Sequence, residues 1–114
     1  MPRDVEAIID AIGNRLRSEI LNLIAESPKT ATSLAESTGS DVTTIRRHLA
    51  ILEELGLVDA DRAPTDRGPG RGRFVLWKTN HQRVEELSTR WIDYATGDVD
   101  GVDPSHPVGS DGPA

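Results

Sequence analysis

Apolar residues recur at three- and four-residue spacing between positions 41 and 56, which is the periodicity of a helix that buries one face. The apolar stripe consists of Ile45, Leu49, Leu52 and Leu55. Asp41 precedes the stripe and can cap the helix, because its carboxylate can accept a hydrogen bond from a first-turn amide. Gly56 follows the stripe, where a left-handed residue commonly ends a helix. Residues 41–56 are therefore expected to form one helix with a defined start and end.

A shorter helix is expected directly before this one, over residues 32–39. Thr32 offers a hydroxyl cap and Gly39 ends the segment. Ser40 alone separates Gly39 from the cap of the next helix. Two helices that are joined by a tight turn containing glycine make a helix-turn-helix.

The second helix of this pair has a polar face that suits contact with DNA. Its N-terminal half presents short side chains followed by two guanidinium groups, at Val42, Thr43, Arg46 and Arg47. After the cap, acidic residues return only at Glu53 and Glu54. A helix with this charge distribution can point its N-terminal half into a major groove, where arginine pairs with guanine.

A β-hairpin with a long loop is expected after the second helix. Alternation over residues 57–62, and aromatic and β-branched residues over 74–78, predict two strands. The loop between them is rich in glycine and proline and carries Arg67, Arg71 and Arg73. Such a loop is a candidate wing that reaches DNA phosphates or a narrow minor groove. The alternative is a solvated loop whose charges only aid solubility.

Two amphipathic helices, over residues 4–12 and 81–96, flank this unit, and a third is expected over 15–25 behind a cap at Asn14. The apolar faces of the two flanking helices exceed what one small core needs. We therefore expect a homodimer seam formed by Val5, Ile8, Ile9, Ile12, Val84, Leu87, Trp91 and Tyr94. A two-fold dimer would match a two-fold DNA site. The alternative is that both helices only cover the core of a monomer.

The net charge of −6 is unevenly distributed along the chain. Residues 1–61 carry −5, residues 62–78 carry +4 and residues 79–114 carry −5, so positive charge concentrates in the predicted wing. The chain has no cysteine, which excludes disulfides, thiol nucleophiles and thiolate metal sites. With neither an apolar run of about 18 residues nor a signal-peptide pattern, we expect a cytoplasmic protein with no membrane partner.

Residues 97–114 are rich in glycine, proline and aspartate, which predicts a disordered acidic tail beyond a single domain over residues 1–96. Asp98, Asp100 and Asp103 alternate with other residues in this tail. They lack the closing glutamate and the flanking helices of a calcium loop, so no calcium site is expected.

Residues 43–58 read Thr-Thr-Ile-Arg-Arg-His-Leu-Ala-Ile-Leu-Glu-Glu-Leu-Gly-Leu-Val, and residues 12–24, 32–39 and 71–77 extend the pattern in both directions. Together they resemble the ArsR-type winged helix-turn-helix repressors. The resemblance implies a homodimer on a palindromic operator, with recognition helices in successive major grooves. By position, it implies DNA contacts by Val42, Thr43, Thr44, Arg46, Arg47 and His48. For His48, a phosphate contact and packing beneath the wing both stay open.

The sequence departs from the metal-sensing members of that family, which place cysteines in the first reading helix or histidine and carboxylate pairs on the last helix. Residues 30–35 contain no cysteine, and the last predicted helix offers His81 with Glu85 and no second histidine. One histidine and a carboxylate do not complete a tetrahedral site. We expect these two to form a surface ion pair, and we expect neither a bound metal nor a cofactor.

The expected fold is mainly α with a small β-hairpin: a winged helix-turn-helix of about five helices and a two-stranded wing. The leading hypothesis is a sequence-specific DNA-binding transcriptional regulator that acts as a homodimer and, by resemblance, represses. The sequence leaves open whether competition for the operator, a partner protein or an organic effector controls DNA binding. The alternative, which the acidic flanks favour, is a winged-helix protein-interaction module that binds no DNA. No spacing of catalytic side chains and no phosphate-cradling loop points to an enzyme.

Overall fold

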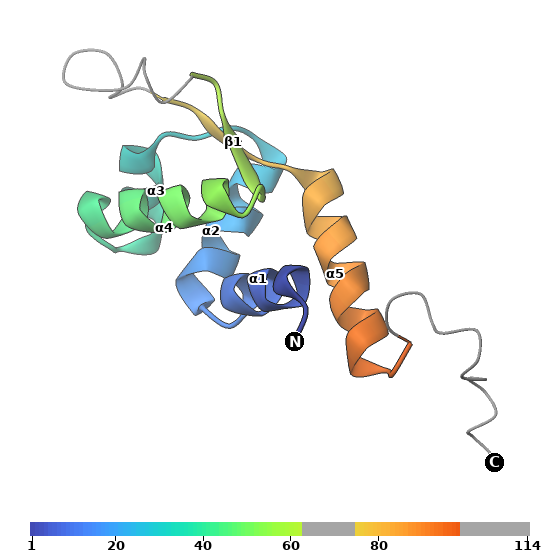
Figure 1. The fold of residues 1–114 in the computed structure, drawn as a ribbon. Helices are drawn as coiled ribbons and strands as arrows, with labels where there is room; N and C mark the ends of the chain where they lie inside the picture. Colours follow the sequence, from blue (N-terminus) through green and yellow to red (C-terminus); the bar gives the residue numbers. More distant parts are fainter. Residues whose placement is uncertain (63–74, 99–114) are drawn as a thin grey trace.

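The computed structural model describes residues 1–62 and 75–98 of the 114-residue chain. Within these residues the elements are α1 (Arg3–Ile12), α2 (Arg15–Glu26), α3 (Ala31–Thr38), α4 (Val42–Glu54), β1 (Val58–Ala60), β2 (Trp77–Thr79) and α5 (His81–Ala95) (Figure 1). The predicted mainly α fold with a two-stranded hairpin is confirmed. In Figure 1, α2, α3 and α4 gather at the base of the hairpin, and α5 runs away from it alongside α1. None of the described helices is long and apolar enough to cross a membrane.

Four helices begin with the same device, a polar side chain that accepts a hydrogen bond from the backbone amide three residues later. The accepting residues are Asn14, Thr30, Asp41 and Asn80, at 2.9–3.1 Å from that amide. The caps at Asn14 and Asp41 are the ones that the sequence predicts. The expected cap at Thr32 is wrong, because α3 begins after Thr30. Extended backbone at Lys29, which pairs with Trp77, brings the chain to Thr30 in the conformation that a cap requires.

Left-handed glycines end both helices of the helix-turn-helix. Gly39 has φ +80° and donates its amide to the carbonyl of Ala35, at 2.9 Å. Gly56 also has φ +80°; its amide bonds to Glu53 O, and the next amide bonds back to Leu52 O. These two bonds form a Schellman motif, which satisfies carbonyls that the end of a helix leaves free. The predicted ends at both glycines are therefore confirmed.

The core lies where α2, α3 and α4 meet the hairpin. Its fully buried side chains include Ile20, Ile24, Leu34, Ile45, Leu49, Leu52 and Leu57. Three residues of the predicted stripe of α4 are among them, and Leu55 at its end is half-buried. Burial on this scale contributes about 1.5–3 kcal/mol for each large aliphatic side chain. The inward face of α4 is thus held by packing, and its opposite face is left to solvent.

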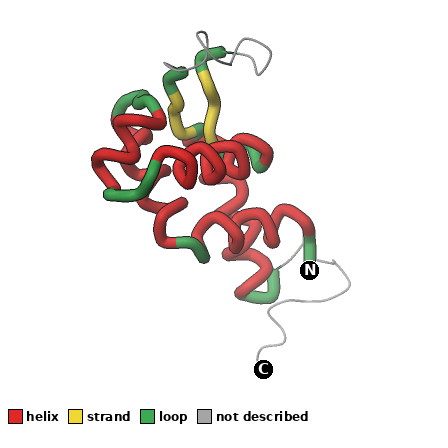
Figure 2. Tube along the Cα trace, turned by 90° about the vertical axis from the view of Figure 1, so that its left-hand side faces the viewer, coloured by secondary structure: helices red, strands yellow, loops and turns green. Residues whose placement is uncertain are grey.

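The hairpin is shorter than predicted and its second strand begins later. β1 and β2 pair antiparallel with Val58 opposite Thr79 and Ala60 opposite Trp77 (Figure 2). Trp77 also exchanges two backbone hydrogen bonds with Lys29, at 3.1 and 2.9 Å. The Thr79 hydroxyl donates to the carbonyl of Leu21 at 2.8 Å, which ties the hairpin to α2. The pairing with Lys29 joins residues far apart in the sequence, so periodicity along the chain could not reveal it.

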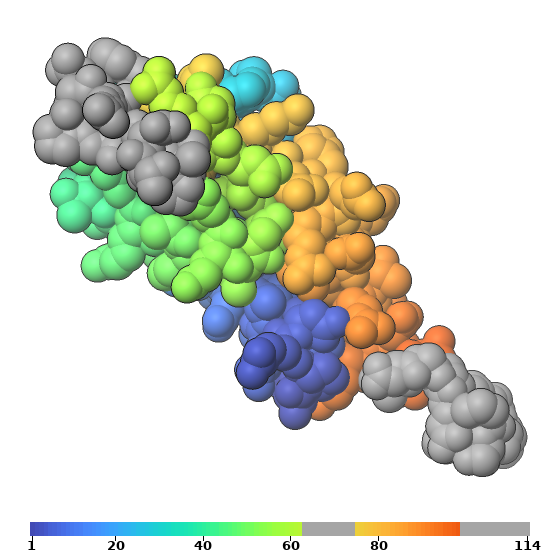
Figure 3. Space-filling model, turned by 45° about the horizontal axis from the view of Figure 1, so that its top comes forward, coloured from blue at the N-terminus to red at the C-terminus, as the bar shows by residue number. Residues whose placement is uncertain are grey.

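The flanking helices α1 and α5 pack against each other within one protomer (Figure 3). Val5, Ile8 and Leu87 are almost completely buried there, with exposed fractions of 2%, 1% and 0%. An ion pair between Arg90 and Asp4, 2.7 Å long, joins the same two helices. These three apolar side chains therefore fill the interior of a single chain. They are not exposed for the dimer contact that the sequence analysis assigns to them.

The predictions for the wing loop and the tail concern residues outside the described ranges. Arg67, Arg71 and Arg73 lie there, as does the tail from residue 99 onward. The boundary between a domain over 1–96 and a tail over 97–114 stays a prediction.

Candidate nucleic-acid interface

The outward face of α4 is a continuous polar stripe. Thr43, Arg46, Arg47 and Ala50 are exposed, at the spacing that places residues on one side of a helix. The buried residues Ile45, Leu49 and Leu52 occupy the other side. Because the core holds the inner side, the two guanidinium groups leave the surface from a helix whose position is fixed. Val42 and Thr44, also predicted to contact DNA, are half-buried.

Thr44 is engaged in the start of α4. Its amide donates to Asp41 Oδ1 at 2.9 Å and its hydroxyl donates to Asp41 Oδ2 at 3.1 Å. The amide and then the hydroxyl of Thr44 hold the pKa of Asp41 below its usual value. The carboxylate therefore stays charged at the positive end of the helix dipole, where an anion is favourable. The hydroxyl of Thr44 serves the cap, whereas Thr43 is exposed and makes no such contact with Asp41.

His48 sits on the inner side of α4, with 8% of its surface exposed. Its Nδ1 accepts a hydrogen bond from Arg17 Nε of α2, at 3.0 Å. Burial lowers the pKa of His48, and the nearby guanidinium groups of Arg17 and Arg47 lower it further. Both roles left open for this residue, a phosphate contact and packing beneath the wing, stay predictions. The ring packs between α4 and α2 as an internal acceptor.

Asp61 and Leu76 pair at the end of the hairpin that is farthest from the helices. The Asp61 amide donates to the Leu76 carbonyl, and Asp61 Oδ1 accepts from the Leu76 amide, both at 3.0 Å. These two bonds extend the pairing one step beyond the strands.

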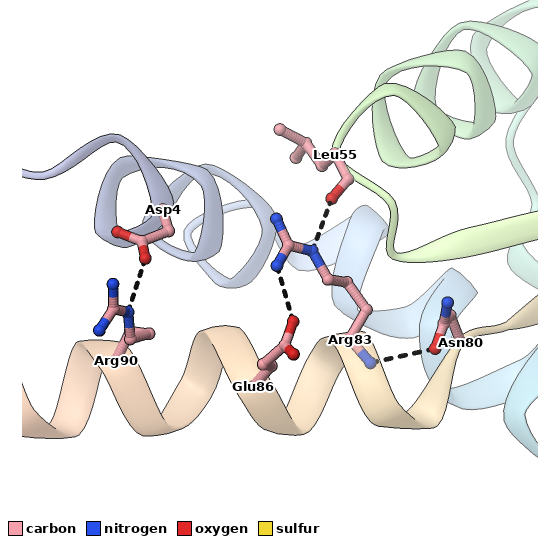
Figure 4. A network of polar contacts seen from close by, with 6 residues as sticks. All are labelled: Asp4, Leu55, Asn80, Arg83, Glu86 and Arg90. Atoms are coloured by element: carbon pink, nitrogen blue, oxygen red, sulfur yellow. Dashed lines mark hydrogen bonds and ion pairs between the residues drawn. The ribbon is translucent and has the colours of Figure 1, made fainter.

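Helix α5 contacts the C-terminal end of α4 through Arg83 (Figure 4). Arg83 Nε donates to the Leu55 carbonyl at 3.4 Å, and Nη1 pairs with Glu86 at 2.8 Å. The expected ion pair between His81 and Glu85 is wrong: His81 Nε2 lies 3.3 Å from the Ala25 carbonyl. The start of α5 faces α2, which places that carbonyl nearer to the ring. Within residues 1–62 and 75–98, no three metal-ligating side chains gather into a cluster.

The outer surface of the α1–α5 layer carries large apolar side chains. Ile12, Trp91, Ile92 and Tyr94 have exposed fractions between 38% and 51%. The sequence predicts three of them, Ile12, Trp91 and Tyr94, as dimer contacts. Ile92 is not in that set, because it does not fall at the three- and four-residue spacing of Val84, Leu87, Trp91 and Tyr94. Ile9 and Val84, also predicted as dimer contacts, are half-buried.

Residues 14–60 match the sequence profile of the family described as bacterial regulatory protein, arsR family. The match runs from the cap of α2 to the end of β1, so it contains the whole helix-turn-helix. This segment is similar to the helix-turn-helix domain of that family. With the hairpin that follows it, the chain has a winged helix-turn-helix fold.

Solved structures agree with the ArsR-like fold. An ArsR-like transcriptional regulator from Rhodococcus sp. RHA1 is 19% identical, with a TM-score of 0.64 over 82% of this chain and 81% of that one. The homodimeric DNA-binding domain of Mb0332 from Mycobacterium bovis is 22% identical, with a TM-score of 0.58 over 83% and 80%. The transcriptional repressor BigR from Xylella fastidiosa is 13% identical, with a TM-score of 0.56 over 80% and 86%. No curated protein sequence matches the chain.

Proposed function

We propose that the protein is a cytoplasmic repressor that binds a palindromic operator as a homodimer and reads each half-site with α4. The observation that carries this proposal is the outward stripe of Thr43, Arg46 and Arg47 on a helix whose inner face is locked in the core. Two adjacent guanidinium groups on a fixed helix suit bidentate pairing with guanine. The ArsR-family match of the same segment supports this role.

A homodimer is supported by the apolar outer surface of the α1–α5 layer. Trp91, Ile92 and Tyr94 gather on the last two turns of α5, and Ile12 is exposed at the end of α1. Aromatic side chains are enriched in the cores of protein interfaces. The Mycobacterium bovis relative is homodimeric, and the Xylella fastidiosa relative is a repressor. We propose Ile12, Trp91, Ile92 and Tyr94 as the centre of the dimer contact.

The loop that joins β1 to β2 is proposed as the second DNA contact. It carries Arg67, Arg71 and Arg73, in the segment whose net charge is +4 while both flanks carry −5. Phosphate binding by such a loop would supply affinity, whereas α4 would supply sequence choice. We propose that an effector other than a metal ion, or a partner protein, controls the binding.

Selection of bound sites from a random duplex library at two salt concentrations tests the proposal. We expect an enriched palindrome whose half-sites are about one helical turn apart. Binding should weaken steeply with salt, because arginine contacts with phosphate release condensed counterions from the DNA. Binding without enrichment that vanishes at moderate salt would overturn the proposal and favour a protein-interaction module.

A further inference from the structure

Arg17 of α2 forms side-chain hydrogen bonds with two other helices, so that three helices are joined at this residue. Its backbone amide donates to the cap Asn14 at the start of α2. Its Nε donates to His48 Nδ1 of α4 at 3.0 Å, and its Nη1 donates to the Asp10 carbonyl of α1 at 3.1 Å. Arg17 therefore links the recognition helix to one of the two helices that form the proposed dimer layer.

The contact with His48 has a defined chemistry. Nδ1 accepts a hydrogen bond only when it carries no proton, so the ring is neutral with its proton on Nε2. Within residues 1–62 and 75–98, no carboxylate forms a hydrogen bond with the Arg17 guanidinium or with the His48 ring. The bond is thus charge-assisted on the donor side and partly buried, which makes its direction costly to change.

His48 directly follows the two outward arginines on the same helix. A rotation of α4 about its axis that moved the His48 ring would also swing Arg46 and Arg47 across the surface. Bidentate pairing with a base edge tolerates little displacement of the guanidinium group. A bond that fixes this rotation therefore acts on DNA reading without touching DNA.

We propose that Arg17 is a positioning residue for DNA reading. From its place on α2, Arg17 donates hydrogen bonds to His48 of α4 and to the Asp10 carbonyl of α1, and these two bonds fix the rotation of α4 about its axis. The inference rests on the proposed DNA-binding function and adds a residue from outside the helix-turn-helix pair to it. Two other roles are distinguishable from this one. The first alternative is a direct contact between Arg17 and a DNA phosphate, and the second is a role in stabilising the fold alone.

The test compares four variants with the wild-type protein on the selected operator duplex over a series of salt concentrations. Arg17→Met removes the donors and keeps the length of the stem. His48→Leu removes the acceptor and keeps an apolar group in a buried position. His48→Asn keeps an acceptor, because its amide oxygen can take the place of Nδ1. The fourth variant combines Arg17→Met with His48→Leu.

We expect Arg17→Met and His48→Leu each to weaken operator binding about tenfold, the size of one charge-assisted hydrogen bond. The double variant should bind no more weakly than either single one, and His48→Asn should bind within about twofold of wild type. The slope of log affinity against log salt should not change, because no phosphate contact is lost. Arg15→Met, on an exposed arginine two residues away, is the matched control and should retain wild-type affinity.

Three results would overturn the proposal. A shallower salt slope for Arg17→Met, with wild-type binding by His48→Leu, would make Arg17 a phosphate contact. Lower melting temperatures with unchanged affinity of the folded protein would make the role purely stabilising. Wild-type protein that binds no operator would remove the proposed function itself, and this inference with it. If His48→Leu does not fold, Arg17→Met with its salt slope and the His48→Asn variant decide between the same outcomes.

Discussion

The helix-turn-helix half of the molecule and the α1–α5 layer both bury one helical face, yet their outward faces differ in chemistry. On α4 the outward residues are Thr43, Arg46 and Arg47. On α5 the outward residues of the last two turns are Trp91, Ile92 and Tyr94. The inward faces are alike, since aliphatic side chains fill both. The difference teaches that function must be sought on the faces that the core does not use.

The two halves are also connected by named contacts. Arg17 joins α1 to α4, and Arg83 joins α5 to the end of α4. Both contacts are made by arginines that are half-buried and that donate to fixed acceptors. The apolar layer and the polar stripe are therefore joined by contiguous hydrogen bonds.

The largest expected effect is on the free energy of unfolding. It tests whether burial in α5 stabilises the fold as much as burial in α4 does. Leu52→Ala in α4 and Leu87→Ala in α5 should each lower the free energy of unfolding by about 2–5 kcal/mol, because both side chains are fully buried. Urea denaturation measures this loss, with Glu54→Ala on the exposed face as control. A cost below about 1 kcal/mol for Leu87→Ala would show that the α1–α5 layer is not held by the protomer core.

The next effect tests the apolar outward face. Trp91→Asp should weaken dimerisation by about 2–4 kcal/mol, since a charge replaces an aromatic group at the centre of the proposed contact. Sedimentation equilibrium measures the dissociation constant. Thr89→Asp, on an exposed polar position of the same helix, is the matched control. Equal dimerisation by both variants would move the interface away from the end of α5.

The polar outward face is tested by removing its guanidinium groups. Arg46→Ala and Arg47→Ala should each reduce discrimination between operator and random duplex by about 1–3 kcal/mol, if the contact is bidentate with guanine. Fluorescence anisotropy on both duplexes measures the two affinities. Arg3→Ala, an exposed arginine on α1, is the control and should change neither. Equal losses on both duplexes would instead assign the arginines to phosphate.

The smallest expected effect concerns the contact between the two halves. Burial and two guanidinium groups lower the pKa of His48, so the unfolded chain takes up a proton before the folded protein does. Stability is therefore complete above the unfolded value of about 6.5 and falls as the pH drops from there toward the folded pKa. Melting temperatures between pH 7.5 and pH 5.5 measure this loss. In His48→Asn the part of the loss due to this residue should disappear, and an identical pH profile would contradict the assignment.

Much of the helix-turn-helix follows from local chemistry. The cap at Asp41 and the left-handed glycines at 39 and 56 act on neighbouring backbone groups, so the sequence shows them directly. The same holds for the buried stripe of α4, whose spacing alone selects one face. The outward arginines are then located by exclusion.

The placement of His48, Arg17 and Trp77 is different in kind. His48 occupies a position next to the outward arginines in sequence and yet faces Arg17, 31 residues away. Trp77 pairs with Lys29. Val5 of α1 and Leu87 of α5 are both buried, and the two helices pack together although they lie at opposite ends of the described chain. A polar residue in a helix gives no sign of which side it occupies until the neighbouring helices are in place.

The sequence by itself determined where helices start and stop, which face of α4 is apolar, and where positive charge concentrates, because these depend on residues within a few positions of each other. Only the tertiary structure decided which apolar residues of α1 and α5 are buried within the chain and which remain exposed. It also decided that Arg17 of α2 holds His48 of α4. Both depend on the packing of segments that are distant in sequence, and that packing is set by the whole core at once.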